Sequence, residues 1–500
     1  MSLAVTYCRA GVGVSAPLVT IEVHVANGLP GLSIVGLAEA AVKESKDRVR
    51  SAIINSHFSF PAKRITINLA PADLPKEGAR FDLAIAIGVL CASGQIEVPH
   101  IDKYEFFGEL ALSGDLRPVA GVLPAAMQCK LEDRELILAK ANAQEAGLVS
   151  ALNAYSASSL LEVCQHLSGQ QTLMPYLQSH EPAETSFWPD MKDVKFQFHA
   201  KRALEVAAAG GHSVLMVGPP GTGKTMLASR LPGILPQMTE QEATEAAAVQ
   251  SISSQGFDVS SWKQRPFRTP HHTSSGVALV GGGGNPKPGE ISLAHHGVLF
   301  LDEFPEFNRH VLEVLREPME SGRITISRAA RQAEFPAKFQ LIAAMNPCPC
   351  GYHGDSSGKC NCSEEKVARY KNKISGPLLD RIDIHIEVPR LKNFSESVAQ
   401  AETETSETIR YRVSKCRQHQ INRSGICNAQ MNVEQIENFC RLDNETHNFL
   451  VNSMEKLNLS NRAFHRVLKV ARTIADLRAN DEIEIADLAE AVAYRRMDRA

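Results

Sequence analysis

Apolar and polar residues alternate over residues 19–26 and again over residues 65–69, with the two-residue period of half-buried strands. A helical pattern lies between them, with Val42, Val49 and Ile53 on one face. The apolar members of the strand patterns are Val19, Ile21, Val23 and Val25, then Ile65, Ile67 and Leu69. Residues 1–167 are therefore predicted to form a mixed α+β domain with its own core.

A polar segment over residues 168–189 follows, rich in Ser, Gln, Glu and Pro and without periodicity, and it is predicted to be a linker. Residues 190–389 then alternate short apolar runs with helical stretches, which is typical of a parallel α/β sheet. These runs are Val214–Val217, Val298–Leu301 and Phe339–Ala344.

Residues 390–500 lack strand-like runs. Their clearest pattern repeats every three to four residues and comprises Phe464, Val467, Val470, Ala471, Ile474 and Leu477. This region is predicted to be a helical bundle.

Composition is that of an ordinary globular chain. The 500 residues are 44% hydrophobic and 22% charged, which excludes wholesale disorder and suggests about three domains. The net charge of -3 excludes a protein that coats nucleic acid by bulk charge, so any contact with phosphate needs a local cluster.

A cytoplasmic protein with no membrane association is expected. The first residues lack the basic and apolar regions of a secretory signal. The longest apolar stretch, Leu83–Ala92, is about half of the roughly 20 residues that a membrane span needs. The 11 cysteines are odd in number and mostly scattered, which favours a reducing compartment over a disulfide framework.

A glycine-rich segment follows the run Val214–Val217 and precedes a helical pattern. It fits the phosphate-binding pattern G-x-x-x-x-G-K-[ST] in the required strand–loop–helix context. Lys224 is expected to reach the β- and γ-phosphates of a nucleotide, and Thr225 to ligate Mg²⁺. The predicted nucleotide-binding residues are Gly218, Pro219, Pro220, Gly221, Thr222, Gly223, Lys224 and Thr225.

Two further apolar strands end in polar residues. The run Val298–Leu301 ends in Asp302 and Glu303, and Phe339–Met345 ends in Asn346. Asp302 is expected to hold Mg²⁺ through water, Glu303 to polarise the attacking water, and Asn346 to orient it. Solvated turns are the alternative for all three, and the upstream phosphate loop favours catalysis.

The order of these motifs, followed by Leu378-Leu-Asp-Arg-Ile-Asp383, resembles AAA+ ATPases of the magnesium-chelatase-like group. Residues 267–273, 297–303 and 375–383 resemble the competence protein ComM / YifB family in particular. The similarity covers essentially the whole chain. It implies an AAA+ core over residues 190–389, a helical lid over residues 390–500, and a homo-oligomeric ring, with six subunits, that hydrolyses ATP with Mg²⁺.

The resemblance also gives roles to two arginines. Arg381 corresponds to the arginine finger, which reaches the γ-phosphate of a neighbouring subunit, and Arg462 corresponds to the second sensor. A fixed guanidinium stabilises charge on a transferred phosphoryl group. A surface charge is the alternative for each arginine. The family usually has glycine where this chain has Phe196, which bears on the backbone near the adenine.

A cysteine-rich insert over residues 348–362 follows Asn346 directly. Cys348, Cys350, Cys360 and Cys362 form the pattern C-x-C-x9-C-x-C, and four such thiolates suit tetrahedral Zn²⁺. Because C-x-C is tighter than the usual spacing, four reduced thiols in a surface loop are the alternative. His353 is the candidate substitute ligand, and a solvated side chain in a glycine-rich turn is the alternative for it.

Residues 1–167 resemble the proteolytic domain of Lon-type proteases. The segment Pro75–Asp82 falls at that family's nucleophile, where this chain has Arg80 in place of serine, and the general-base lysine falls near Leu123. Without a nucleophile and an activating amine the protease chemistry cannot run. This domain is therefore expected to serve assembly or partner binding.

Two functions follow from the resemblance. The ComM family implies a helicase that drives branch migration on single-stranded and branched DNA in natural transformation, with a recombination protein as partner. Magnesium chelatase implies instead a remodelling ATPase that acts on a protein. Basic residues in predicted loops would track a phosphate backbone, namely Arg323, Arg328, Arg331 and Lys338 around a hairpin and Lys287 in a glycine-rich insert. A solvated face is the alternative for these charges. The stretch Arg410–Arg423 in the helical region is the other candidate for a DNA contact.

Overall fold

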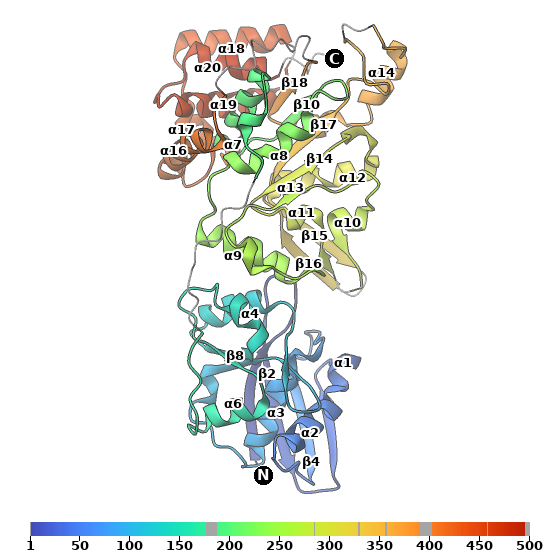
Figure 1. Ribbon diagram of the computed structural model, residues 1–500, viewed down its shortest axis with the longest axis vertical. Coiled ribbons are helices and arrows are strands. Elements are labelled where there is room, and N and C mark those ends of the chain that lie inside the picture. The colour runs from blue at the N-terminus through green and yellow to red at the C-terminus, as the bar shows by residue number, and fades with distance from the viewer. Residues whose placement is uncertain are drawn as a thin grey trace. The chain divides into compact units, whose positions relative to one another are not determined.

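The computed structural model describes residues 2–176, 188–284, 286–328, 331–355, 358–390, 403–457 and 459–495 (Figure 1). The chain divides into two compact units. The N-terminal unit comprises Met1–Ala183, Thr244–Trp262 and Ala329–Phe335, and the C-terminal unit comprises Glu184–Ala243, Lys263–Arg328 and Pro336–Ala500. Within the predicted linker, residues 177–187 lie outside the described part.

The first sheet of the N-terminal unit contains both predicted alternating strands. Strands β1 (Ser2–Arg9), β2 (Leu18–Ala26), β4 (Arg64–Ala70) and β3 (Gly31–Val35) lie side by side in that order. β1, β2 and β4 pair antiparallel, and β3 joins β4 in parallel. The apolar side chains of both patterns are buried, which confirms the alternation as an in-and-out pattern.

A second sheet of this unit is parallel and contains β5 (Tyr104–Phe107), β8 (Glu135–Ala139) and β9 (Ala154–Ala157). A short antiparallel pair, β6 (Glu109–Leu110) and β7 (Leu116–Arg117), lies between β5 and β8 along the chain. The helices are α1 (Ala40–Lys43), α2 (Ser45–Asn55), α3 (Asp82–Ala92), α4 (Val122–Leu131), α5 (Ala143–Ala146) and α6 (Leu160–Leu167).

The apolar run Leu83–Ala92 is a core helix. All residues of α3 except Cys91 are buried, and the helix packs against β1, β2, β5 and α2. A helix that is apolar on every side gives no periodic signal, so the sequence pattern did not identify it as helical. No helix in the described part of the chain is long and apolar enough to cross a membrane.

A five-stranded parallel sheet forms the centre of the C-terminal unit, as the alternation of strands and helices predicts. Its strands are β11 (Phe267–Arg268), β14 (Val298–Leu301), β17 (Gln340–Met345), β10 (Val214–Val217) and β18 (Ile384–Glu387), in that spatial order. The side chains of β10, β14 and β17 are all buried. Strands covered on both faces read as continuous apolar runs, which is the pattern seen in the sequence.

Further helices and two short hairpins lie between these strands along the chain, and residues 244–262 and 329–335 among them belong to the N-terminal unit. The hairpins are β12 (Gly281–Gly282) with β13 (Lys287–Pro288), and β15 (Arg323–Arg328) with β16 (Arg331–Pro336). The helices are α7 (Phe198–Gly210), α8 (Lys224–Ile234), α9 (Glu240–Ser251), α10 (Gly276–Val280), α11 (Glu290–Leu293), α12 (Arg309–Val314), α13 (Arg316–Ser321), α14 (Glu364–Lys371) and α15 (Gly376–Leu379).

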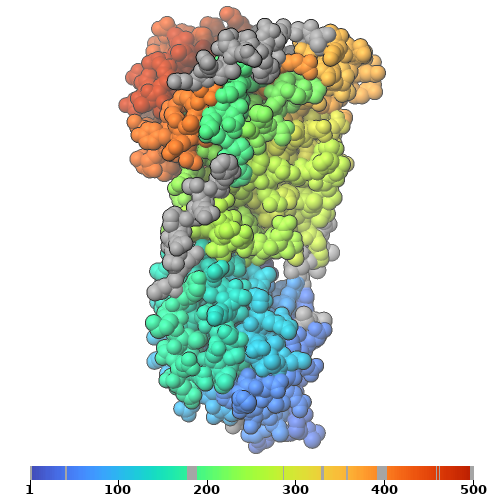
Figure 2. All heavy atoms as spheres, in the orientation of Figure 1, coloured from blue at the N-terminus to red at the C-terminus, as the bar shows by residue number. Residues whose placement is uncertain are grey.

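Beyond β18, the described residues of the C-terminal region are helical, as expected. They form α16 (Ser406–Ser424), α17 (Val433–Phe439), α18 (Asn444–Leu457), α19 (Asn461–Leu477) and α20 (Ile485–Ala493). α16 and α19 pack against α7, and one hydrophobic core joins them to the sheet. Figure 2 shows this region, orange to red, packed closely against the green core of the same unit.

A buried polar network ties α19 to the beginning of the sheet. The carboxylate of Asp383, just before β18, accepts hydrogen bonds from Arg466 at 2.5 Å and from the backbone N–H of Ser213 at 3.3 Å. His212 lies between Asp383 at 3.2 Å and the Thr473 hydroxyl at 2.8 Å. Burial opposes ionisation of Asp383, but Arg466 and His212 outweigh it and hold its pKa well below the usual range.

We expect Asp383→Asn to lower the free energy of unfolding of the C-terminal unit by about 2 to 3 kcal/mol, because it removes the nearly buried carboxylate that binds the partly exposed Arg466 and His212. The folded-state pKa of Asp383 is depressed. Its stabilisation is therefore present above the unfolded-state pKa of about 3.9 and is lost as the pH falls toward the folded value. Denaturant unfolding at neutral and acidic pH measures both effects.

The matched control is Asp380→Asn, three residues upstream, where the side chain is 39% exposed and lies 4.0 Å from Arg495. A change of about 1 kcal/mol or less is expected there. Equal losses in the two variants, or a loss for Asp383→Asn that persists fully in acid, would contradict the role of the ionised carboxylate.

Candidate functional site

The glycine-rich loop connects the carboxyl end of β10 to the first turn of α8. Gly221 and Gly223 have φ angles of +76° and +88°, in the left-handed region that favours glycine. At Gly218 a Cβ atom would lie 2.2 Å from the carbonyl oxygen of Val388, so no larger residue fits. The backbone conformation or a close contact therefore requires glycine at each of these positions. The loop leads into the N-terminus of α8, where N–H groups bind anions.

Lys224 connects the loop to the end of strand β17. Its Nζ donates to the carbonyl oxygens of Gly218 at 2.7 Å and Pro219 at 3.0 Å, and to Oδ1 of Asn346 at 3.2 Å. Burial lowers the pKa of Lys224, and the nearby Asp302 carboxylate opposes that change. The ammonium is thus held by neutral oxygens, in a place where an anionic phosphate would be a stronger partner.

The two residues predicted to hold Mg²⁺ are in contact. The Thr225 hydroxyl donates to Oδ2 of Asp302 at 2.7 Å, and Oδ1 of Asp302 accepts the backbone N–H of Glu303 at 2.9 Å. A hydroxyl and a carboxylate side by side are oxygen ligands of the kind that Mg²⁺ prefers. The donor set therefore fits the metal, and Mg²⁺ bound there would neutralise phosphate charge.

Glu303 contacts a residue to which the motif analysis gave no role. Its Oε2 atom lies 2.9 Å from Nδ1 of His272, and its own φ angle is +52°. His272 follows strand β11, which is next to β14 in the sheet. Sequence reasoning noted His272 only within a family motif, because a contact between residues 31 positions apart leaves no local signal.

The phosphate loop and the residues at the ends of β14 and β17 line one pocket of about 380 Å³. Its walls include Lys224, Thr225, Asp302, Glu303 and Asn346. Three strands of a parallel sheet deliver these side chains at one edge, the usual position of ligand sites in open α/β sheets. The structure thus brings together the phosphate loop, the two acids and the amide, as predicted from their places at strand ends.

Arg381 lies at the opposite, amino-terminal ends of the strands in the same sheet. It precedes β18, which pairs in parallel with β10 so that Val214 faces Ile384. The phosphate loop follows the other end of β10, four residues away, which is about 13 Å of strand. Among the described residues that line the 380 Å³ pocket, Arg381 is absent. The register therefore keeps this guanidinium away from its own phosphate loop.

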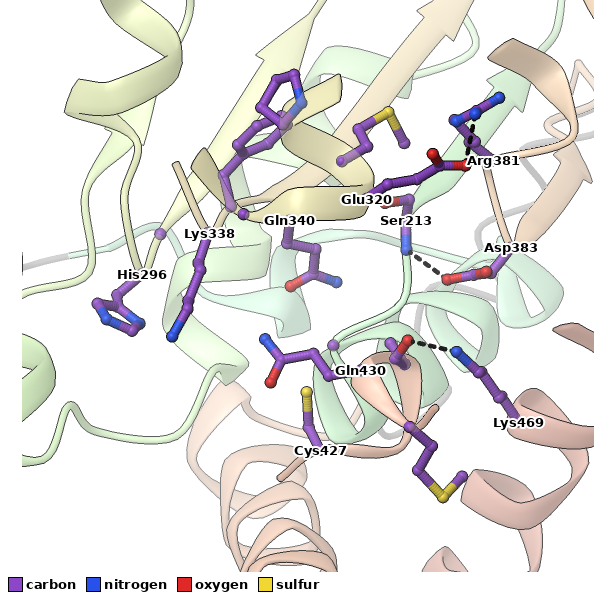
Figure 3. Close-up of a pocket in the computed structure, with 18 of the residues that line it drawn as sticks. Ser213, His296, Glu320, Lys338, Gln340, Arg381, Asp383, Cys427, Gln430 and Lys469 are labelled. Atoms are coloured by element: carbon purple, nitrogen blue, oxygen red, sulfur yellow. Dashed lines mark hydrogen bonds and ion pairs between the residues drawn. The ribbon is translucent and has the colours of Figure 1, made fainter. Parts of the chain in front are cut away.

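The Arg381 side chain is only 8% exposed, and its contacts are defined. Nη2 lies 2.5 Å from Oε1 of Glu320, at the end of α13, and Nη1 donates to the carbonyl oxygen of Pro377 at 2.6 Å. Figure 3 shows Glu320 and Arg381 facing each other at the rim of a second pocket, of about 590 Å³. Glu320 is a partner that the sequence pattern did not indicate.

Two other residues named from the resemblance are not among those that line the phosphate pocket. Arg462 is exposed in the first turn of α19, four residues before Arg466, and it does not line the 380 Å³ pocket. Phe196 has a φ angle of +60°, so the backbone there takes the conformation that glycine, the residue usual in the family, adopts most easily.

The four cysteines of the insert converge. Their Sγ atoms all lie within 4.8 Å of one another, with Cys348–Cys350 at 3.3 Å, Cys350–Cys360 at 3.6 Å and Cys348–Cys360 at 3.9 Å. His353 is not part of this group, and only its backbone N–H contacts Cys348 Sγ, at 3.3 Å. Bonds of about 2.3 Å to a tetrahedral Zn²⁺ separate sulfurs by roughly 3.8 Å, so the spacing fits zinc.

Arg80 and Leu123 mark the positions that carry the Lon nucleophile and base. The Arg80 guanidinium stacks over the Phe107 ring at 5.3 Å, and a Cβ atom at Gly121 would lie 3.8 Å from its Nη1. Burial lowers the pKa of Arg80, with Cys8 opposing. Leu123 is fully buried in α4. These two positions provide neither a nucleophile nor a base; the likeness to Lon itself stays a prediction.

Most of the predicted basic residues fall on or beside the hairpins β12–β13 and β15–β16. Lys287 on β13 and Arg323 on β15 are exposed, as is Lys338. The hairpins lie against each other, because a Cβ atom at Gly281 would lie 2.7 Å from Cδ1 of Ile326. Arg328 and Arg331 end their strands at the turn, and their side chains lie outside the described residues.

The basic stretch Arg410–Arg423 on α16 is engaged within the unit. Arg412 pairs with Glu404 and Glu205, and Arg423 pairs with Asp476. Arg417 donates to the carbonyl oxygens of Ala208 and Ala209 at the end of α7. These charges hold α16 on its neighbours, which makes this stretch a weaker surface for nucleic acid than the hairpins.

Three sequence families match consecutive parts of the chain. Residues 190–396 match "Magnesium chelatase, subunit ChlI", residues 21–142 match "Subunit ChlI of Mg-chelatase", and residues 403–495 match its C-terminal family. Competence protein ComM of Haemophilus influenzae is 54% identical, over 100% of this chain and 98% of that protein. The uncharacterized protein YifB is 49% identical in Salmonella typhimurium and 48% in Escherichia coli, with the same coverage.

We expect Glu303→Gln to retain ATP binding and to lose hydrolysis by about 10²-fold or more, because an amide cannot take a proton from the attacking water. Fluorescent-nucleotide titration and phosphate release separate the two effects. Glu306→Gln is the control, since Glu306 lies on the next turn and pairs with Lys373 at 3.1 Å outside the pocket. A Glu303→Gln protein that turns over at the wild-type rate would refute the assignment.

Proposed function

The chain belongs to the ComM / YifB family of magnesium-chelatase-like AAA+ ATPases, and from this membership we propose that it is an ATP-driven ring motor acting on DNA. Its function in this proposal is branch migration that promotes recombination in natural transformation. The competence name of the relative from Haemophilus influenzae supports the process, and the exposed cations of strands β13 and β15 support the substrate. Its cofactors are ATP and Mg²⁺, with Zn²⁺ at the four cysteines.

Hydrolysis in this proposal uses the residues at the carboxyl edge of the sheet. The loop N–H groups and Lys224 hold the phosphates, and Thr225 and Asp302 hold Mg²⁺. Asn346, hydrogen-bonded to Lys224, would orient the water from which Glu303 withdraws a proton. His272 is the counter-group of Glu303 in the chain alone, and nucleotide binding would compete for that carboxylate.

The proposal of a ring is supported by the positions of the phosphate loop and Arg381, which lie at opposite ends of the strands in one sheet. Arg381 cannot reach its own phosphate loop along β18, so it would serve the loop of another subunit. A second chain would then supply the guanidinium that stabilises the transferred phosphoryl group. Arg462, exposed at the start of α19, is proposed as a further contact to nucleotide between subunits.

DNA is favoured as the substrate by where the exposed cations lie. Lys287 and Arg323 come from two hairpins that touch through Gly281 and Ile326. Alternation along β15 buries Ile324 and Ile326 and leaves the intervening residues exposed, so the strand presents a polar face. Exposed cations on such hairpins would bind a phosphate backbone without reading sequence.

A protein remodeller is the second candidate function. Net charge is -3, and the N-terminal unit matches the ChlI subunit of magnesium chelatase over residues 21–142. An ATPase of that kind would transmit hydrolysis to a protein partner. Only a DNA motor releases counterions from a polyanion, so salt-dependent stimulation of hydrolysis by single-stranded DNA distinguishes the two.

We expect Arg381→Ala to bind ATP and to hydrolyse it about 10³-fold more slowly, since the charge on the phosphoryl group loses its partner. Lys224→Ala should lose nucleotide binding. Mixing the two inactive proteins should restore part of the activity, because a Lys224→Ala subunit still donates Arg381 to its neighbour. Arg369→Ala, an arginine 79% exposed on α14, is the control and should stay active. Mixed rings that remain inactive would refute a shared site.

We expect the double variant Lys287→Ala with Arg323→Ala to weaken DNA binding at every sequence and to keep basal hydrolysis. Each lost phosphate contact should flatten the dependence of log K on log salt by about 0.7 for single strands. Fluorescence anisotropy over a salt series measures this slope. Lys366→Ala with Arg369→Ala, two exposed cations on α14, is the charge-matched control.

An unchanged slope in the hairpin variant would place the DNA contact elsewhere. ATP-loaded rings that bind no DNA, and that fail to move a three- or four-stranded junction, would refute the motor and favour the remodeller.

A further inference from the structure

The cysteine insert lies directly against the two parts of the nucleotide pocket that hold Lys224. Asn346 is separated from Cys348 by one residue, and Cys348 is fully buried. Gly351 has a φ angle of +86°, and a Cβ atom there would lie 2.6 Å from Cδ of Pro220 in the phosphate loop. The insert therefore packs on the loop at a distance that allows no side chain between them.

The insert holds Asn346 from its far end as well. Helix α14 begins immediately after Cys362, with Ser363 as its N-cap. Tyr370 on this helix is 5% exposed, and its hydroxyl has a hydrogen bond with the backbone of Asn346. The chain thus leaves Asn346, passes through the four cysteines and returns to Asn346.

The insert is also held by backbone turns and by the Arg390 guanidinium, which lies 5.8 Å from the centre of the Tyr352 ring. Its described residues, 348–355 and 358–362, form neither helix nor strand. Long stretches without secondary structure are uncommon in compact domains unless they serve a function. The Sγ atoms of the four cysteines converge, and the backbone N–H of His353 donates a hydrogen bond to Cys348 Sγ. Such N–H groups around sulfur are typical of the surroundings of thiolate-bound metals.

We propose that Zn²⁺ bound by Cys348, Cys350, Cys360 and Cys362 is a clamp that sets the distance between the phosphate loop and Asn346. The bound metal holds the four cysteines of the insert together. In this conformation Gly351 packs against Pro220, and Tyr370 is hydrogen-bonded to the backbone of Asn346. The hydrogen bond between Lys224 and Asn346 then has a fixed geometry. This inference rests on the proposed nucleotide site and adds to it a metal-dependent order of the pocket.

The test compares wild type with Cys360→Ser/Cys362→Ser, and uses Cys91→Ser, a partly exposed cysteine in α3, as the control. Zinc is measured by elemental analysis of reduced, zinc-replete protein. Hydrogen–deuterium exchange is followed over residues 218–226 and 345–350, and affinity is measured with a fluorescent ATP analogue. Cys362→His, which keeps a zinc ligand, is the conservative variant.

Wild type, Cys91→Ser and Cys362→His should each hold about one zinc per chain and protect both segments. The double serine variant should hold none, exchange faster in both segments and bind the analogue about tenfold more weakly, because small displacements of positioning groups are costly. If that variant does not fold, removal of zinc from wild type by a chelator gives the same three readouts.

Wild type without zinc would overturn the metal assignment. Loss of zinc with unchanged exchange and unchanged affinity would overturn the clamp. Exchange and zinc content require neither hydrolysis nor DNA, so a zinc-dependent protection in a protein that moves no junction would count against the motor alone and leave the clamp in place.

Discussion

The parallel register of β10, β14 and β17 is the constraint on which the candidate site depends. Val217 pairs with Met345, and Leu301 pairs with Ala343, so β10 and β17 end together and β14 ends two residues earlier. Parallel strands all point their carboxyl ends to one edge, and there the chain can gather a loop, two acids and an amide from distant segments. An antiparallel β14 would place its acids at the wrong edge.

The residues at the amino-terminal ends of the same strands make different contacts. The segment before β18 holds Arg381 against Glu320, and Asp383 in a buried network with His212 and Arg466. The network joins the C-terminal helices to the sheet, and Arg381, which is 8% exposed, lies near it. The phosphate loop and the arginine proposed to serve a neighbouring subunit are thus separated by the length of one strand.

Both charged residues with the most direct proposed roles in hydrolysis have counter-groups in the chain alone. Glu303 contacts His272 at 2.9 Å, and Arg381 contacts Glu320 at 2.5 Å. The Glu320 carboxylate lowers the cost of burying the Arg381 guanidinium, which is 8% exposed, whereas Glu303 is 53% exposed. In the proposed ring, nucleotide and a neighbouring subunit would compete with these two contacts.

The sequence by itself determined the elements with a local signal: the alternating strands, the apolar strands of the sheet, helix α19, and the loop whose glycines need left-handed φ angles. It also placed Asp302, Glu303 and Asn346 at strand ends. Only the tertiary structure decided the partners, because contacts such as Glu303 with His272 and Arg381 with Glu320 join segments with no common periodicity. Helix α3 was decided in the same way: a segment apolar on every side becomes a helix through packing against β1 and β2, and its own pattern does not distinguish it from a strand.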